Sequence, residues 1–106
     1  MKGVKMELRD LINRASRRSV DSGFWEGLDP LDVNIRLAKL ALLTSEIGEA
    51  VEAVRKNDQE NLGEELADIA IRLFDLGPAL GFDLEAEILK KMDKNDLRPY
   101  KHGKLA

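Results

Sequence analysis

The sequence contains no cysteine, which excludes disulfide bonds and thiolate metal sites. Aromatic residues make up only 5% of its 106 residues, so a hydrophobic core has to be built from aliphatic side chains, as in packed helices. No apolar run approaches the ~20 residues that span a membrane, and no signal-peptide pattern opens the chain. We therefore expect a cytoplasmic protein that does not associate with membranes.

Charged residues are abundant, at 35% of the sequence, and they are unevenly distributed. Residues 1–20 carry six basic and two acidic side chains, and residues 88–106 carry the same numbers. Residues 41–75, in contrast, carry nine acidic and three basic side chains. Basic ends around an acidic middle argue against stable nucleic-acid binding. They fit a site that holds a cation at its centre and an anion at its edge.

Apolar residues recur at helical spacing, and no segment shows the alternation of a strand. Asp29-Pro30 and Asp83 are typical helix starts, Asn57-Asp58 is a turn, and Pro78 should kink or fray a helix end. One all-α domain over residues 1–106 is predicted, in which residues 96–106 form a basic tail. Its four helices are expected over residues 5–19, 30–56, 60–80 and 84–95.

The second predicted helix is apolar on more than one side, since Ala38, Ala41, Leu42 and Leu43 widen its apolar stripe. A single chain of this length buries only a modest core. Part of this helix therefore requires a partner surface, and a homodimer or homotetramer is expected.

Two pairs of acidic residues carry the chemistry of this sequence. Glu46 and Glu49 lie in the second predicted helix, and Glu65 and Asp68 lie in the third. Residues three apart share one face of a helix, so each pair presents two carboxylates together. If the helices pack antiparallel across the Asn57-Asp58 turn, the pairs lie at similar distances from it and face each other.

Four carboxylates in one half-buried place repel strongly, so either several are protonated or a cation lies among them. Ligands that are all oxygen atoms favour a hard cation, and Mg²⁺ or Mn²⁺ is the natural choice. The alternative is that both pairs belong to solvated faces and contact lysines.

Further polar residues offer binding candidates. Lys91 and Asn95 share a face of the last helix and precede Arg98, and they either contact phosphate or complement the helix dipole. Lys39 lies two turns before Glu46 and either reaches a phosphate or forms a surface ion pair. Trp25 either stacks on a base or fills a small core together with Phe24. Arg72 should contact Asp68 or Asp75.

The acidic pairs, written Glu46-x-x-Glu49 and Glu65-x-x-Asp68, resemble the ExxE…ExxD signature of the MazG-like all-α nucleoside triphosphate pyrophosphohydrolases. Gly23-Phe24-Trp25, the Lys91-x-x-x-Asn95 spacing and the segment from Arg98 to Lys104 extend the resemblance over residues 23–104. Residues 1–22 match no motif.

The resemblance implies that Glu46, Glu49, Glu65 and Asp68 hold Mg²⁺, which binds the triphosphate while water cleaves between the α and β phosphates. Glu46 and Glu49 would be the catalytic carboxylates, Glu49 positioning or deprotonating the water. It also implies that Lys91 and Asn95 contact the nucleotide and that the protein is a homo-oligomer. The base and the sugar are not readable from the sequence.

Two other classes of protein also place paired glutamates on helices. A di-iron bundle normally requires Glu-x-x-His, and the single histidine here, His102, is in the tail. A non-catalytic helical module that binds a metal or a nucleotide stays open, and metal-dependent turnover would discriminate it from an enzyme.

Overall fold

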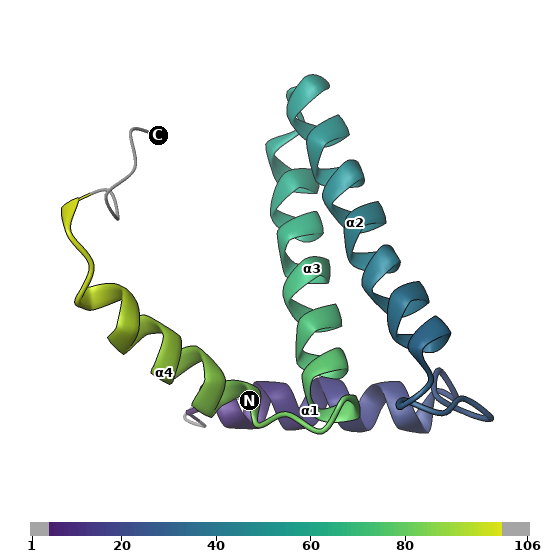
Figure 1. Ribbon diagram of the computed structural model, residues 1–106. Coiled ribbons are helices and arrows are strands. Elements are labelled where there is room, and N and C mark those ends of the chain that lie inside the picture. The colour runs from purple at the N-terminus through teal and green to yellow at the C-terminus, as the bar shows by residue number, and fades with distance from the viewer. Residues whose placement is uncertain (1–4, 101–106) are drawn as a thin grey trace.

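The computed structural model describes residues 5–100, which fold into four helices with no strand among them. The helices are α1 (Leu8–Asp21), α2 (Val33–Arg55), α3 (Gln59–Ala79) and α4 (Leu84–Asp96). Figure 1 shows α2 and α3 as an antiparallel pair, with α1 running across the base of α3 and α4 on the side of α3 away from α2. The predicted all-α, four-helix chain is thus confirmed for the described residues.

The turn between α2 and α3 lies at Asn57-Asp58, as predicted. Asn57 adopts a left-handed backbone conformation (φ 54°), which asparagine tolerates better than most residues do. The backbone N–H of Asp58 donates to the Ala53 carbonyl at 2.9 Å, and its side chain accepts from the Asn61 N–H at 3.1 Å. These bonds end α2 and start α3, so they set the register of the two helices.

The predicted start of the second helix at Asp29-Pro30 is wrong, because Asp32 is the N-cap of α2. The Asp32 side chain accepts from the Asn34 N–H at 2.8 Å, while the Asp29 side chain accepts from the Leu31 N–H at 2.9 Å. The earlier aspartate therefore closes a separate turn. Arg36 holds that turn by donating from Nε to the Pro30 carbonyl at 2.7 Å.

Helix α1 begins and ends slightly later than the predicted range of 5–19. Its start is set by Glu7, whose backbone N–H donates to the Asp10 carboxylate at 3.0 Å. A carboxylate that accepts from a free N–H in the first turn stabilises a helix start.

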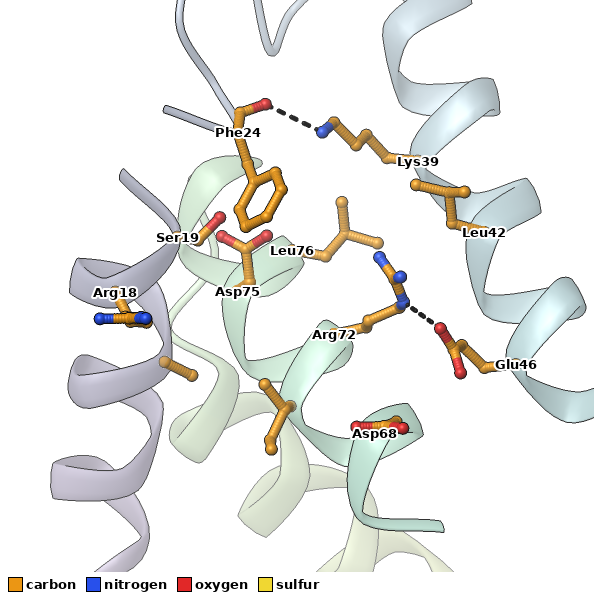
Figure 2. Close-up of a pocket in the computed structure, with 12 residues that line it drawn as sticks. Arg18, Ser19, Phe24, Lys39, Leu42, Glu46, Asp68, Arg72, Asp75 and Leu76 are labelled. Atoms are coloured by element: carbon orange, nitrogen blue, oxygen red, sulfur yellow. Dashed lines mark hydrogen bonds and ion pairs between the residues drawn. The ribbon is translucent and has the colours of Figure 1, made fainter. Parts of the chain in front are cut away.

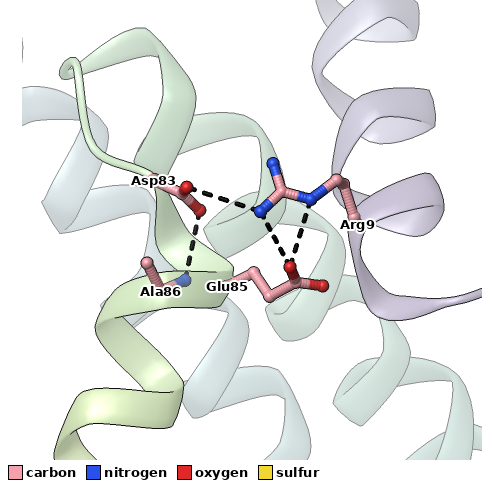
Figure 3. A network of polar contacts seen from close by, with 4 residues as sticks. All are labelled: Arg9, Asp83, Glu85 and Ala86. Carbon is pink, nitrogen blue, oxygen red and sulfur yellow. Dashed lines mark hydrogen bonds and ion pairs between the residues drawn. The ribbon is translucent and has the colours of Figure 1, made fainter.

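An ion-pair network ties the start of α4 to α1 (Figure 3). The Arg9 guanidinium donates to Glu85 Oε1 at 2.8 and 3.1 Å and to Asp83 Oδ2 at 3.4 Å. Asp83 is also the predicted N-cap, since its side chain accepts from the Ala86 N–H at 3.1 Å. The Ala86 amide and the Arg9 charge hold the pKa of Asp83 below its usual value. The direction in which α4 leaves α3 is set by these contacts and by Gly81, which has a φ of 87°.

The buried core of the single chain is small. Only Ile12, Ala50, Ala53 and Leu76 are buried apolar residues within the described range. The two alanines allow α2 and α3 to approach closely near their turn. The radius of gyration is 16.4 Å, whereas a compact domain of this length has roughly 13 Å. Among residues 5–100, no helix combines the length and apolar character that crossing a membrane requires.

Candidate functional site

The two acidic pairs face each other across α2 and α3, as predicted. One oxygen each of Glu46, Glu49 and Glu65 lie within 4.8 Å of one another. Asp68 does not belong to this close group, but it lines the same pocket as Glu46. The structure therefore brings three of the four predicted ligands together, and it places the fourth one turn further along α3.

Glu65 is a partly buried member of the acidic cluster, which here means Glu46, Glu49, Glu65 and Asp68. Its Oε2 atom is inaccessible to solvent and has no hydrogen-bond partner. Burial, followed by the neighbouring Glu49, Asp68 and Glu46 carboxylates, raises the pKa of Glu65 to about 7 from an ordinary value of 4.5. Near neutral pH this carboxyl group therefore holds a proton in a substantial fraction of the molecules.

Glu46 is held in the opposite state by Arg72. The Arg72 Nε donates to Glu46 Oε1 at 2.8 Å, and the Glu46 side chain is only 13% exposed. This hydrogen bond is the main reason why the pKa of Glu46 lies below its ordinary value. The expectation that Arg72 contacts Asp68 or Asp75 on its own helix is not met. Arg72 points across to α2, where it pairs with the Glu46 carboxylate (Figure 2).

The donor set fits a hard divalent cation. It consists only of carboxylate oxygens, three of which converge, and burial and the neighbouring carboxylates raise the pKa of one of these glutamates, Glu65, to about 7. Carboxylate oxygens are the preferred ligands of Mg²⁺ and Mn²⁺. A divalent ion would replace the proton on Glu65 and remove the repulsion among the carboxylates.

A pocket of about 500 Å³ leads from the acidic cluster towards α1 (Figure 2). Helices α1, α2 and α3 and the segment before α2 all contribute to its wall. The acidic end has Glu46 and Asp68, and the other polar and apolar groups include Ser19, Phe24, Lys39, Asp75 and Leu76. Sequence reasoning missed Ser19 and assigned Asp75 only as a possible partner of Arg72. The signal for Asp75 was its position two helical turns after Asp68.

The aromatic segment before α2 is fastened beside this pocket. Trp25 Nε1 donates to Asp75 Oδ1 at 2.9 Å. The Lys39 ammonium lies 4.6 Å from the centre of the Trp25 ring and donates to the Phe24 carbonyl at 3.1 Å. Trp25 is thus anchored by its polar edge and covered on one face, whereas Phe24 is 64% exposed and lines the pocket.

The nucleotide-binding residues predicted in and after the last helix are not part of this pocket. Lys91 and Asn95 are on α4, which packs against α1 and α3, and Arg98 follows the helix. None of these three residues lines the pocket that contains Glu46 and Asp68. Figure 1 shows α4 on the side of α3 away from α2, the helix that carries Glu46 and Glu49. The Lys101-His102-Gly103-Lys104 part of the predicted basic tail falls outside the described residues.

Comparison with family models gives a match to the MazG-like family over residues 35–104. This range contains the acidic cluster, Lys39, Arg72 and α4, while the Gly23-Phe24-Trp25 segment precedes it. Comparisons with curated proteins and with solved structures found no significant match. The match covers well over half of the chain. This chain belongs to the MazG-like family.

Proposed function

We propose that this protein hydrolyses a (deoxy)nucleoside triphosphate to the monophosphate and pyrophosphate, in a reaction that depends on a divalent metal and serves to clean the nucleotide pool. The observation that carries the proposal is the convergence of Glu46, Glu49 and Glu65 in a MazG-like chain. A triphosphate carries about four negative charges, so it can approach this acidic cluster only together with cations.

Glu46, Glu49, Glu65 and Asp68 are the residues that would hold Mg²⁺ or Mn²⁺. When bound, the metal neutralises the triphosphate and stabilises the negative charge on the departing pyrophosphate. The four carboxylates would in turn determine where the metal and the bound triphosphate lie. Arg72 keeps Glu46 ionised and fixes its orientation, because it donates to Oε1 and leaves Oε2 for another partner.

Glu49 is the proposed general base. It is exposed, and one of its oxygens belongs to the close group with Glu46 and Glu65. Glu49 accepts a proton from the attacking water, the water oxygen forms a bond to phosphorus, and the bond between the α and β phosphates breaks. Pyrophosphate leaves with the electron pair of that bond. No covalent bond to the protein is needed, because water is the nucleophile.

We further propose that the active protein is a homodimer or a homotetramer. The apolar side chains left exposed along α2 include Val33, Leu37, Leu40, Ile47, Val51 and Val54. No residue of α4 is buried, although Leu89 and Met92 are among its exposed apolar residues. In the proposed oligomer a second copy covers these faces, and its Lys91, Asn95 and Arg98 add further polar and basic groups beside the acidic cluster.

The decisive experiment is incubation of a panel of ribo- and deoxynucleoside triphosphates with the protein and Mg²⁺, followed by separation of the products. Monophosphate and pyrophosphate, formed without diphosphate, are expected, and chelation of the metal should stop the reaction. Diphosphate and orthophosphate would show that a different bond is cut. Binding of metal and nucleotide without any turnover would instead favour the non-catalytic module. The ion pair between Arg72 and Glu46, which partly compensates the negative charge of the acidic cluster, is compatible with such a module.

A further inference from the structure

Two basic side chains line the pocket beside the acidic cluster and retain unused hydrogen-bond donors. Lys39 comes from α2 and Arg72 from α3. Among the residues that the structure describes, Arg72 donates only from Nε, to Glu46 Oε1 at 2.8 Å. A guanidinium group also carries N–H donors on its terminal nitrogens. These donors of Arg72 therefore remain available to an acceptor that enters the pocket.

Lys39 is held in place by neutral groups. Its ammonium group donates to the Phe24 carbonyl at 3.1 Å and lies 4.6 Å from the centre of the Trp25 ring. Between residues 5 and 100, none of the ion pairs includes Lys39. A carbonyl dipole and an aromatic ring orient a cation, but they do not neutralise its charge. Lys39 thus brings a full positive charge and a further N–H donor to the wall of the pocket.

The two cations form a row that ends at the acidic cluster. Lys39 and Glu46 are seven residues apart, which puts them on one face of α2 and about 10 Å apart along its axis. Arg72 reaches across from α3 to Glu46, and Figure 2 shows its guanidinium group at a level between Lys39 and Glu46. The order along the pocket is therefore Lys39, then Arg72, then the carboxylates.

A diphosphate group fits this order of charges. The planar guanidinium group of an arginine donates paired hydrogen bonds to a phosphate, whereas a lysine acts as a compact point charge. An anion with two linked phosphates can pair with both cations, while a neutral base would leave both charges without a counter-ion. A divalent ion at the neighbouring carboxylates would offset their repulsion of such an anion.

We propose that Lys39 and Arg72 form the binding site for the β and γ phosphates of the triphosphate, which leave together as pyrophosphate. Arg72 donates from its terminal nitrogens to the β phosphate, and Lys39 donates to the γ phosphate. The inference rests on the proposed function for the placement of the α phosphate at the acidic cluster. Positive charge at this site stabilises the negative charge that develops on the departing pyrophosphate.

Trp25 acts in this site as a positioning residue. Its Nε1 donates to Asp75 Oδ1 at 2.9 Å, which ties the ring to α3. The fixed ring lies against the Lys39 ammonium group and so limits the directions in which this long side chain can point. The aromatic segment before α2 therefore serves the phosphate end of the ligand.

Binding of inorganic pyrophosphate tests the site without any turnover. The full-length protein is titrated in a calorimeter with magnesium pyrophosphate, and with orthophosphate for comparison. We expect pyrophosphate to bind roughly 10-fold more tightly than orthophosphate. Lys39→Met and Arg72→Met should each weaken pyrophosphate binding by roughly 10-fold, the scale of one charge-assisted hydrogen bond. Arg55→Met and Lys56→Met, at the end of α2 and outside the pocket, are matched controls that should bind pyrophosphate as wild type does.

The response to metal separates direct contact with the anion from a general loss of structure. The rise in melting temperature with Mg²⁺ alone should be no smaller in Lys39→Met and Arg72→Met than in wild type, because both residues act on the anion. Arg72→Lys keeps the charge and should retain part of the pyrophosphate binding. If Arg72→Met does not fold, Arg72→Lys takes its place, with a smaller expected loss.

The role of Trp25 is tested through Lys39. Trp25 is the only tryptophan in the chain, so pyrophosphate should change its fluorescence in wild type and not in Lys39→Met. Trp25→Phe, which lacks the bond to Asp75, should weaken pyrophosphate binding about 3-fold in the wild-type background and no further in Lys39→Met. An equal loss in both backgrounds would refute positioning through Lys39.

The outcomes separate this inference from the proposed function. Pyrophosphate binding that depends on both cations, without any triphosphate hydrolysis, supports the site and refutes only the reaction. Triphosphate hydrolysis together with unchanged pyrophosphate affinity in either variant overturns the two-cation site. Equal affinity of wild type for pyrophosphate and orthophosphate overturns it as well, since one phosphate would then suffice. An absence of pyrophosphate binding to wild type has the same consequence.

Discussion

Arg72 on α3 donates from Nε to Glu46 Oε1 on α2 at 2.8 Å, so one arginine joins the two helices at the acidic cluster. The contact divides the glutamates into two kinds. Glu46 is compensated and stays ionised, whereas Glu65 has no such partner and has a pKa of about 7. The protein thus carries one permanent cation within a group of acids that also fits a divalent metal.

Removal of Arg72 should make the protein more dependent on metal. Without metal, Arg72→Met is expected to lower the free energy of unfolding by about 1 kcal/mol or less, because the arginine side chain is 43% exposed and solvent weakens the ion pair. The rise in melting temperature on adding Mg²⁺ should be larger than in wild type, since the metal then also relieves the uncompensated Glu46. Thermal unfolding with and without Mg²⁺ measures both effects. The Arg72→Lys variant should show a rise in melting temperature between those of wild type and Arg72→Met. An unchanged metal response in Arg72→Met would contradict this role of Arg72.

Glu65 should make the metal-free protein less stable as the pH rises. Its pKa is about 7 in the folded state and 4.5 ordinarily, so between these values the folded state binds more protons than the unfolded state. The free energy of unfolding therefore decreases with rising pH in this window. Denaturant unfolding with a metal chelator at about pH 5, 6, 7 and 8, a range of roughly three pH units, should show the decrease. Glu65→Gln should flatten the profile, and a wild-type profile that rises from pH 5 to 7 would contradict the assignment.

Glu49 should be required for turnover more than for binding. We expect Glu49→Gln to reduce kcat by at least ~100-fold, the usual scale for losing a general base. Binding of the nucleotide with Mg²⁺ should persist, because Glu46, Glu65 and Asp68 remain as ligands. Steady-state kinetics and calorimetry provide the two measurements, and Glu52→Gln on the same helix is a matched control. A variant with wild-type kcat would exclude Glu49 as the base.

Lys91 should act on the acidic cluster of another copy. Lys91→Ala alone is expected to weaken nucleotide turnover while leaving stabilisation by metal intact. When Glu49→Gln and Lys91→Ala subunits are unfolded together and refolded, half of the resulting dimers carry both variants. Each of these mixed dimers contains one intact site, so about a quarter of the wild-type activity should return. If the mixture shows only the sum of the two separate activities, Lys91 does not act in this way.

The exposed face of α2 should hold the oligomer together. Leu37 is 60% exposed in the single chain, and Leu37→Glu should dissociate the protein because a buried charge at an apolar interface is unfavourable. Light scattering is the measurement, with Asn34→Glu at a polar position of α2 as the control. A wild-type mass equal to the 11.9 kDa of one chain would refute the assembly.

The sequence by itself predicted the helices and the facing acids. Helical periodicity, the aspartate caps and the Asn57-Asp58 turn are local features, and they determine that two amphipathic segments return on each other. Once the helices are antiparallel, carboxylates at matched distances from the turn have to face one another. Convergence of Glu46, Glu49 and Glu65 therefore followed from spacing alone.

The sequence did not show which of two similar residues caps a helix or which of several carboxylates pairs with an arginine. Asp29 and Asp32 are both good helix caps, yet Asp32 caps α2, while the preceding turn has its Pro30 carbonyl bonded to Arg36. Arg72 had acidic neighbours on its own helix, yet it reaches α2. Side-chain direction and burial, which depend on how the helices pack, decide such cases.

Only the tertiary structure decided what the residues between the motifs do. Periodicity gave no reason to connect Ser19 with Asp75, because they lie on different helices and far apart in the sequence. Packing of α1 against α3 places both on one pocket and leaves the serine hydroxyl without a partner. Local spacing determines which groups share a helix face, but only the packing of helices determines which groups from different helices line one pocket.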